Sequence, residues 1–235
     1  HLQHGFALDT VAPALLGFLA SVYDVSSESR RDALRHRASL LGMGVTGRSM
    51  TQPPFAKVNT GPELPAMFAR YKDLVEQELS RSVPDTDTAS LYVLLQYHLG
   101  RVDRLGNRAE TPISQGKALR PTLCLFACEA LCLETSRALS AAAALELVHN
   151  FSLIHDDIQD HDRERRHQPT VWYVWGVPKA LVAGNGLQSV GDLTLLNTAR
   201  REARPETVLK VSHLLTASYL EMIEGQCLDL SFEAR

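Results

Sequence analysis

The sequence predicts an all-α protein built as a bundle of long, mostly antiparallel helices. After residue 65, long apolar segments are separated by short clusters of Gly, Pro and polar residues. The segment ALSAAAALELVHNFSLI is rich in Ala and Leu, which favour helix, and it lacks the period-two alternation of a strand. The one β-like patch is VWYVW at residues 171–175, which is too short and isolated to form a sheet.

Clusters of Gly, Pro and polar residues set the limits of the predicted helices. The long helices are predicted at residues 65–80, 88–100, 121–133, 138–160, 177–201 and 205–230. Two shorter ones, at residues 11–23 and 29–41, precede a stretch rich in Pro and Gly at residues 47–65. We therefore expect a helical N-terminal segment (1–46), a linker (47–65) and a helical domain (66–235).

The composition is that of a globular protein with a substantial core, since 45% of the 235 residues are hydrophobic. With 24 basic and 27 acidic residues, the chain has no general nucleic-acid surface, and anions must be bound by local clusters. The apolar run at residues 6–22 contains Asp and Pro, so neither a membrane span nor a secretory signal is expected. Cys124, Cys128 and Cys132 recur at helical spacing, which indicates buried core thiols and a cytoplasmic protein.

An acidic cluster, DDIQD, ends one predicted helix and indicates a metal site. Asp156 and Asp160 are four residues apart and share a helix face, with His149 two turns earlier and Glu146 extending the row. Carboxylates at this spacing repel each other, and a divalent cation would offset the repulsion. Oxygen ligands favour Mg²⁺, which typically takes one or two carboxylates together with water and substrate phosphates.

Basic residues near the acidic cluster indicate a diphosphate site. Arg165 and Arg166 follow it closely, and Lys117 and Arg120 lie upstream in GKALRP. Guanidinium groups offer paired donors that suit phosphate oxygens. The alternative is that these charges form a solvated, self-paired surface at a helix end. The strongly apolar FSLI at residues 151–154 favours a site, because unpaired charges at the end of a buried helix are costly.

Several motifs in this order resemble a known family. They are GKALRP (116–121), LELVHNFSLIHDDIQD (145–160), RRHQPT (165–170), GVPKALVAGNGL (176–187) and GQCLDL (225–230). Together they are similar to the motifs of the trans-isoprenyl diphosphate synthases, also called polyprenyl synthetases. The resemblance implies the isoprenoid synthase fold, a helical bundle around a central cavity, and a homodimer.

The resemblance also assigns roles to individual residues. It implies that Asp156 and Asp160 bind Mg²⁺ with support from Asp157, and that Arg165 binds an allylic diphosphate. The residues implied to bind isopentenyl diphosphate are Lys117, Arg120, His149 and Arg166. In the implied reaction the allylic diphosphate ionises, the isopentenyl double bond attacks the cation, and a proton is lost. Metal and arginine charges stabilise the departing diphosphate.

In this family, bulky side chains one helical turn before the aspartates limit the length of the product. Phe151 stands five residues before Asp156, and the small Ser152 follows it. This pattern is similar to that of synthases making a C20 chain, with C15 as the next choice. The implied product is therefore geranylgeranyl diphosphate, or else farnesyl diphosphate.

The chain departs from the family pattern at several points. The family's second aspartate-rich motif, and a Lys-Thr pair that precedes it, do not occur in these 235 residues. The sequence is therefore expected to be either part of a longer protein or a shortened relative. In either case we do not expect these residues alone to catalyse the reaction at the full rate. His167 replaces a glycine, and Asn185 an aspartate. The alternative function is a non-catalytic, synthase-like subunit that binds diphosphates or regulates a catalytic partner. A terpene cyclase is disfavoured, because it needs no isopentenyl site.

Overall fold

The computed structural model describes most of the chain after residue 65. The described residues are 66–84, 90–109, 118–132, 134–198 and 203–233. The two predicted N-terminal helices, the linker and Lys117 lie outside them, so the proposed division of the chain stays a prediction. In the described part no helix is both long and apolar enough to span a membrane.

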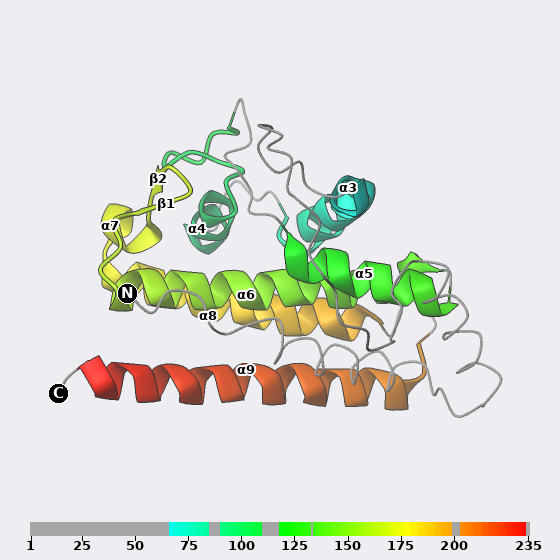
Figure 1. Ribbon diagram of the computed structural model, residues 1–235. Coiled ribbons are helices and arrows are strands. Elements are labelled where there is room, and N and C mark those ends of the chain that lie inside the picture. Colours follow the sequence, from blue (N-terminus) through cyan, green and yellow to red (C-terminus); the bar gives the residue numbers. More distant parts are fainter. Residues whose placement is uncertain (1–65, 85–89, 110–117, 133, 199–202, 234–235) are drawn as a thin grey trace, which may run out of the picture.

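The prediction of an all-α bundle is confirmed (Figure 1). The long helices are α3 (Ala66–Ser82), α4 (Ser90–His98), α5 (Leu119–Cys132), α6 (Leu139–Gln159), α8 (Val177–Leu196) and α9 (Pro205–Glu233). A short 3-10 helix, η1 (Thr135–Ala138), leads into α6. Each long helix begins within two residues of its predicted start, because clusters of Pro, Gly and polar residues interrupt the helical segments. The central cavity stays a prediction.

The β-like patch VWYVW is helical in the structure and forms α7 (Val171–Trp175). Thr170 precedes it in extended conformation, and Gly176 ends it with φ of 84°. A positive φ favours Gly at this position, because Gly has no Cβ that would clash with the backbone. Pro178 lies in the first turn of α8. N–H groups in the first turn make no hydrogen bond within the helix, so the missing N–H of proline has no cost there. β-branched and aromatic residues favour strands only when a neighbouring strand is present, so tertiary context decides here.

A small hairpin that the sequence did not predict follows α6. Its strands are β1 (Glu164–Arg165) and β2 (Gln168–Pro169), paired antiparallel with Arg165 opposite Gln168. Arg166 and His167 form the turn with φ of 55° and 65°. Two left-handed residues in a two-residue loop match the twist of the strands they join. His167 therefore occupies a position that favours glycine, which is the residue the resembled motif has there.

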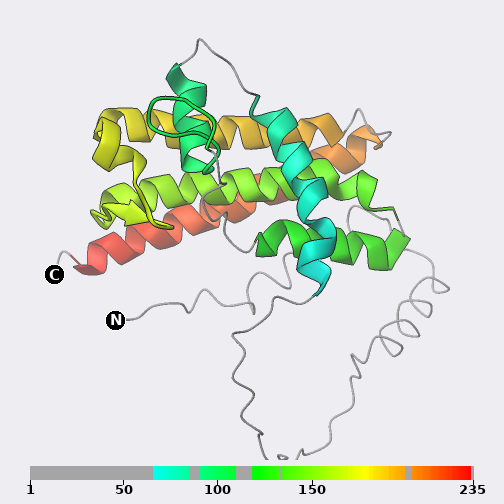
Figure 2. The same ribbon diagram turned by 90° about the horizontal axis from the view of Figure 1, so that it is seen from above.

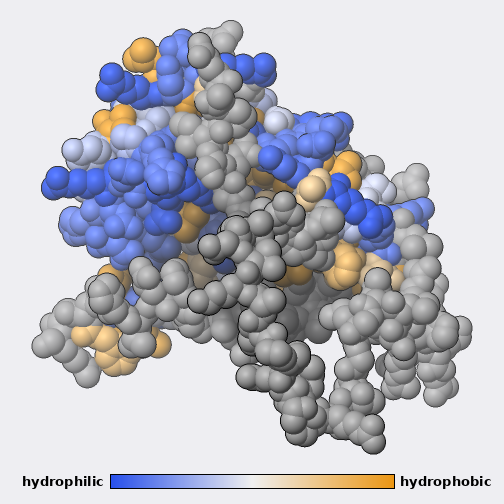
Figure 3. Space-filling model, turned by 45° about the horizontal axis from the view of Figure 1, so that its top comes forward, coloured by the Kyte–Doolittle hydropathy of each residue, from blue (hydrophilic) through white to orange (hydrophobic). Residues whose placement is uncertain are grey.

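Helix α6 lies at the centre of the bundle. It packs side by side with α8 along most of its length, while α3 and α5 cover its other side and α9 runs along the bundle below α8 (Figures 1 and 2). Small residues allow the close approach of α6 and α8: Ala142, Ala143 and Ala144 are fully buried, and a Cβ at Gly191 would lie 3.1 Å from Val148 Cγ2. The predicted core thiols Cys124 and Cys128 are also fully buried. On the face seen in Figure 3, the described residues are mostly hydrophilic.

We expect Leu147→Ala to lower the free energy of unfolding by about 2–5 kcal/mol, because it removes a fully buried side chain from α6 and leaves a cavity. Leu105→Ala, at a residue that is 78% exposed, is the matched control and should change the free energy by less than about 0.5 kcal/mol. Denaturant unfolding measures both. Equal effects would show that α6 is not the centre of the core.

Candidate active site

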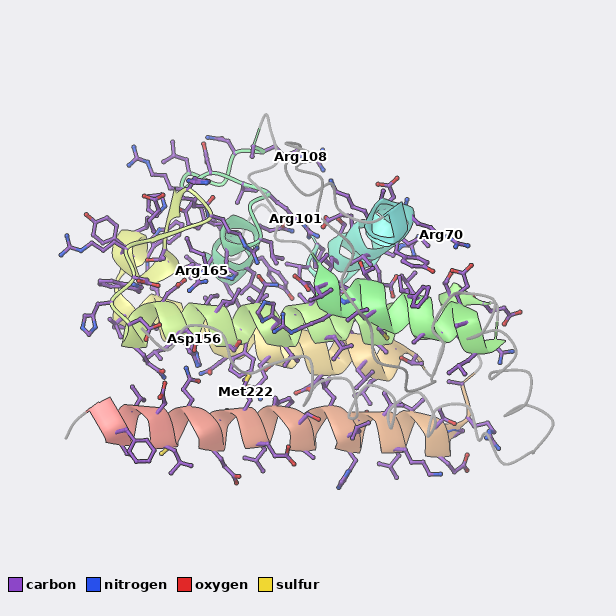
Figure 4. All side chains as sticks on the ribbon, in the orientation of Figure 1. Arg70, Arg101, Arg108, Asp156, Arg165 and Met222 are labelled. Carbon is purple, nitrogen blue, oxygen red and sulfur yellow. The ribbon has the colours of Figure 1, made fainter. Side chains whose placement is uncertain are left out.

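The acidic end of α6 presents three carboxylates in three different environments, and Figure 4 labels one of them, Asp156. Asp157 is buried and accepts a hydrogen bond of 2.5 Å from Arg165 Nε. Asp156 is partly buried, and its Oδ1 accepts a hydrogen bond from Gln226 Nε2 of α9. Asp160 is exposed, and its N–H donates to the Asp156 carbonyl at 2.8 Å. The carboxylates predicted to bind metal are thus the more accessible ones, while Asp157 faces the protein.

Asp157 holds Arg165 in place rather than competing for a cation. Burial raises the pKa of Asp157 to about 6, although the neighbouring Arg165 acts in the opposite direction. Arg165 Nη2 also lies 3.8 Å from Asp162 Oδ2. Two carboxylates therefore orient one guanidinium, which keeps further N–H groups for other acceptors. This arrangement fits the supporting role that the resemblance implies for Asp157.

The loop between α6 and the hairpin is fixed mainly by one carbonyl. The carbonyl of Asp162 accepts hydrogen bonds from Thr170 Oγ1 at 2.8 Å and Trp172 Nε1 at 2.7 Å. The N–H of Asp162 donates to the Asp157 carbonyl at 3.0 Å. These bonds join the end of α6 to the start of α7 and so set where the intervening hairpin lies.

His149, Arg120 and Arg166, which are predicted to bind isopentenyl diphosphate, are close enough for the two arginines to influence the pKa of the histidine. Burial lowers the pKa of His149 to about 3, and the charges of Arg120, Arg166 and Arg165 act in the same direction. His149 is therefore neutral near pH 7 and able to hydrogen-bond without adding charge. Burial raises the pKa of Glu146, while Arg166 and Arg120 lower it. This buried carboxylate partly balances the arginines around the site.

The residues predicted to set product length lie beneath this site. Phe151 is buried and packs edge-on against His155 at 5.4 Å and against Tyr219 of α9 at 6.3 Å, measured between ring centroids. Ser152 is also buried, and its Oγ donates to the His149 carbonyl at 2.8 Å. Phe151 therefore has support from two helices, as a rigid floor requires.

The residues at the end of α6 fit a Mg²⁺ ion shared with a phosphate ligand. Asp156 and Asp160 supply only carboxylate oxygens, the donors that Mg²⁺ prefers, and both reach solvent. Among residues of the described ranges, no group of three or more His, Cys, Asp or Glu side chains could hold a metal. Two carboxylates suffice where water and phosphate oxygens complete an octahedral shell.

The sequence prediction omitted several residues that the structure places at this site. Gln226 of α9 donates a hydrogen bond to Asp156. It lies in the motif GQCLDL, which was the signal in the sequence that could have identified it. Tyr97 and Gln168 bond to each other's segments beside the arginines. Their roles depend on contacts between segments about 70 residues apart in the chain, which spacing along the sequence does not reveal. Lys117 is outside the described residues, and its role stays a prediction.

An all-α bundle with carboxylates and arginines gathered at one helix end is the architecture of an isoprenoid synthase domain. The sequence model of the polyprenyl synthetase family matches residues 103–235, and the chain belongs to this family. The resemblance read from the motifs is thereby confirmed.

Named proteins of this family are similar to a large part of the chain. A (2E,6E)-farnesyl diphosphate synthase of Mycobacterium bovis is 37% identical over 157 residues, covering 66% of this chain and 41% of that relative. A geranylgeranyl diphosphate synthase of Methanosarcina mazei is 44% identical over 120 residues, covering 51% of this chain and 36% of that relative. The crystal structure of a polyprenyl synthetase from Streptomyces coelicolor A3(2) has a TM-score of 0.63 at 34% identity, covering 74% of this chain and 49% of that one. The chain spans less than half the length of these relatives.

The neutral state of His149 predicts a loss of stability in acid. Its folded pKa, about 3, lies below its unfolded value of about 6.5, so the folded state binds fewer protons. The stabilisation is present above pH 6.5 and is lost as the pH falls toward 3. We expect His149→Gln to make this decline shallower by up to about 1.4 kcal/mol per pH unit.

Denaturant unfolding at several pH values measures the effect of His149→Gln. His161→Gln, at an exposed histidine, is the control and should leave the slope unchanged. Parallel curves for the wild type and His149→Gln would contradict the prediction.

Proposed function

We propose that this chain forms the substrate-binding part of a Mg²⁺-dependent prenyltransferase. The reaction condenses isopentenyl diphosphate with an allylic diphosphate to give a short-chain prenyl diphosphate. The observation that carries the proposal is the gathering of Asp156, Asp157 and Asp160 at the end of α6 with Arg165 bound to Asp157. The names of the related synthases, which make farnesyl and geranylgeranyl diphosphates, support the same reaction.

Two groups of side chains divide the binding of the substrates. Asp156 and Asp160 hold Mg²⁺, and Arg165 donates to the allylic diphosphate beside it. Bound Mg²⁺ supplies positive charge that stabilises the departing diphosphate. Arg120, His149 and Arg166, together with Lys117, hold isopentenyl diphosphate. The charges are in place before the reaction begins, so little reorganisation is needed when the diphosphate departs.

Neutral His149 and buried Glu146 moderate the positive charge at the isopentenyl site. Without them, several cations around a small buried region would repel one another strongly. His149 donates a hydrogen bond to a diphosphate oxygen in its neutral form. The apolar residues beneath it exclude water from the reacting carbons, which protects a carbocation from hydrolysis.

The proposed product is C20, or else C15, because Phe151 closes the space beneath the aspartates. We also propose that the enzyme is a cytoplasmic homodimer. The large apolar side chains exposed on α8 and α9, such as Leu193 and Leu220, support a further packing partner for this side of the bundle. Analytical ultracentrifugation of the full-length protein tests the dimer.

We expect Asp156→Asn to lower kcat by about 10²–10³-fold, because it weakens the charge stabilisation of the departing diphosphate. An assay of the full-length protein with labelled isopentenyl diphosphate, an allylic primer and Mg²⁺ measures this. Asp73→Asn, at an exposed residue of α3, is the matched control and should retain full activity. Equal activity of the two variants would remove the basis of the proposed function.

We expect Phe151→Ala to give products at least one isoprene unit longer than the wild type, because it removes the aromatic floor. Chromatography of the dephosphorylated products identifies their length. Phe126→Ala, at a partly buried residue of α5, is the control for general loosening of the core. An unchanged product length in Phe151→Ala would show that another residue stops the growing chain.

A further inference from the structure

The arginine hairpin is fixed to the end of α4 by two reciprocal hydrogen bonds. Gln168 Nε2 donates to the Tyr97 carbonyl at 2.7 Å, and Tyr97 Oη donates to the Pro169 carbonyl at 2.8 Å. Tyr97 also packs edge-on against Trp175, with 4.8 Å between ring centroids. The side chain of Gln168 thus holds the backbone of Tyr97, and the side chain of Tyr97 holds the backbone of Pro169. The pair, which we name the Tyr97–Gln168 clamp, restrains the hairpin that carries Arg165 and Arg166.

A small pocket lies directly beside this clamp. Its lining includes both arginines of the hairpin together with His98, Asp157 and Gln168. Two oxygen atoms on its lining residues are buried and have no hydrogen-bond partner among the described residues: Asp157 Oδ2 and Gln168 Oε1. Asp157 and Gln168 are 1% and 8% exposed. Buried polar atoms nearly always have a partner, so these two oxygens require an explanation.

A single water molecule is the simplest partner for both oxygens. The pocket has a volume of about 20 Å³, and a single water needs roughly 10–15 Å³ together with two to four polar partners. A water donates two hydrogen bonds, one for each of the two oxygens. The imidazole of His98, which also lines the pocket, hydrogen-bonds to Asn150 instead. A cation is disfavoured, because two guanidinium groups line the pocket.

We propose that this pocket binds one ordered water molecule, which donates to Asp157 and Gln168. Through this water and the Tyr97–Gln168 clamp, Tyr97 and Gln168 position the arginine pair. The water completes the bonds of Asp157, whose other oxygen holds Arg165. The positioning part of this inference rests on the proposed function, whereas the water site does not.

The first test is a high-resolution crystal structure of the full-length protein. We expect electron density for one water within hydrogen-bond distance of Asp157 Oδ2 and Gln168 Oε1. In Gln168→Leu the water should be absent or displaced. A wild-type pocket without this water, or a water that remains in place in Gln168→Leu, would overturn the water site.

The second test measures how Tyr97→Phe changes the binding of inorganic pyrophosphate in the presence of Mg²⁺. The variant loses one hydrogen bond of the clamp and keeps the aromatic packing. We expect the dissociation constant from calorimetry to rise about three- to tenfold. Tyr92→Phe, at a partly buried residue of the same helix, is the matched control and should bind as the wild type does.

The two measurements separate positioning from general stability. A merely structural role for Tyr97 would lower the thermal unfolding midpoint and leave the pyrophosphate affinity of the folded protein unchanged, which would overturn the positioning role. If the wild type binds no pyrophosphate, the proposed function fails. A crystal structure of Tyr97→Phe then decides the positioning role, since a hairpin unmoved from its wild-type place would overturn it.

Discussion

The buried ion pair between Asp157 and Arg165 is the interaction on which the site depends. Asp157 lies at the end of the most buried helix, and Arg165 begins the hairpin that follows it. A buried carboxylate without a partner is costly, so the pair constrains the hairpin to fold back over the end of α6. The carboxylates at the end of α6 and the arginine groups are thereby placed beside each other. Removing Arg165 would leave a buried carboxylate without its partner.

The burial of α6 explains why Asp157 needs a positively charged partner. Alanines and one glycine bring α6 and α8 into close contact, and α3 and α5 cover the opposite side. The polar residues in the packed part of α6 must therefore be neutral or paired. His149 responds to burial by staying neutral, and Glu146 by balancing nearby arginines. The more accessible carboxylates, Asp156 and Asp160, lie at the C-terminal end of the helix.

Helix positions and the acidic cluster could be predicted from the sequence because both depend on local patterns. Periodicity and capping signals located the long helices, and the spacing of Asp156 and Asp160 placed them on one face. The hairpin at residues 164–169 could not be predicted, since its strands are two residues long and have no alternating pattern. Its position depends on Tyr97, which lies about 70 residues away in the chain. Contacts of this kind leave no signal in spacing, whereas Gln226 lies in the motif GQCLDL, which was a signal in the sequence.

The turn of the hairpin shows how these distant contacts influence local conformation. Arg166 and His167 both have positive φ, a conformation that costs a residue with a Cβ about 1–2 kcal/mol. Such strain persists only where the surrounding structure over-determines the backbone. Here Arg165 is bound to Asp157 on one side of the turn, and Gln168 is bound to Tyr97 on the other. With both ends fixed, the two-residue connection has to turn in the left-handed sense. The turn brings Arg166 close enough to His149 and Glu146 to lower the pKa of both groups.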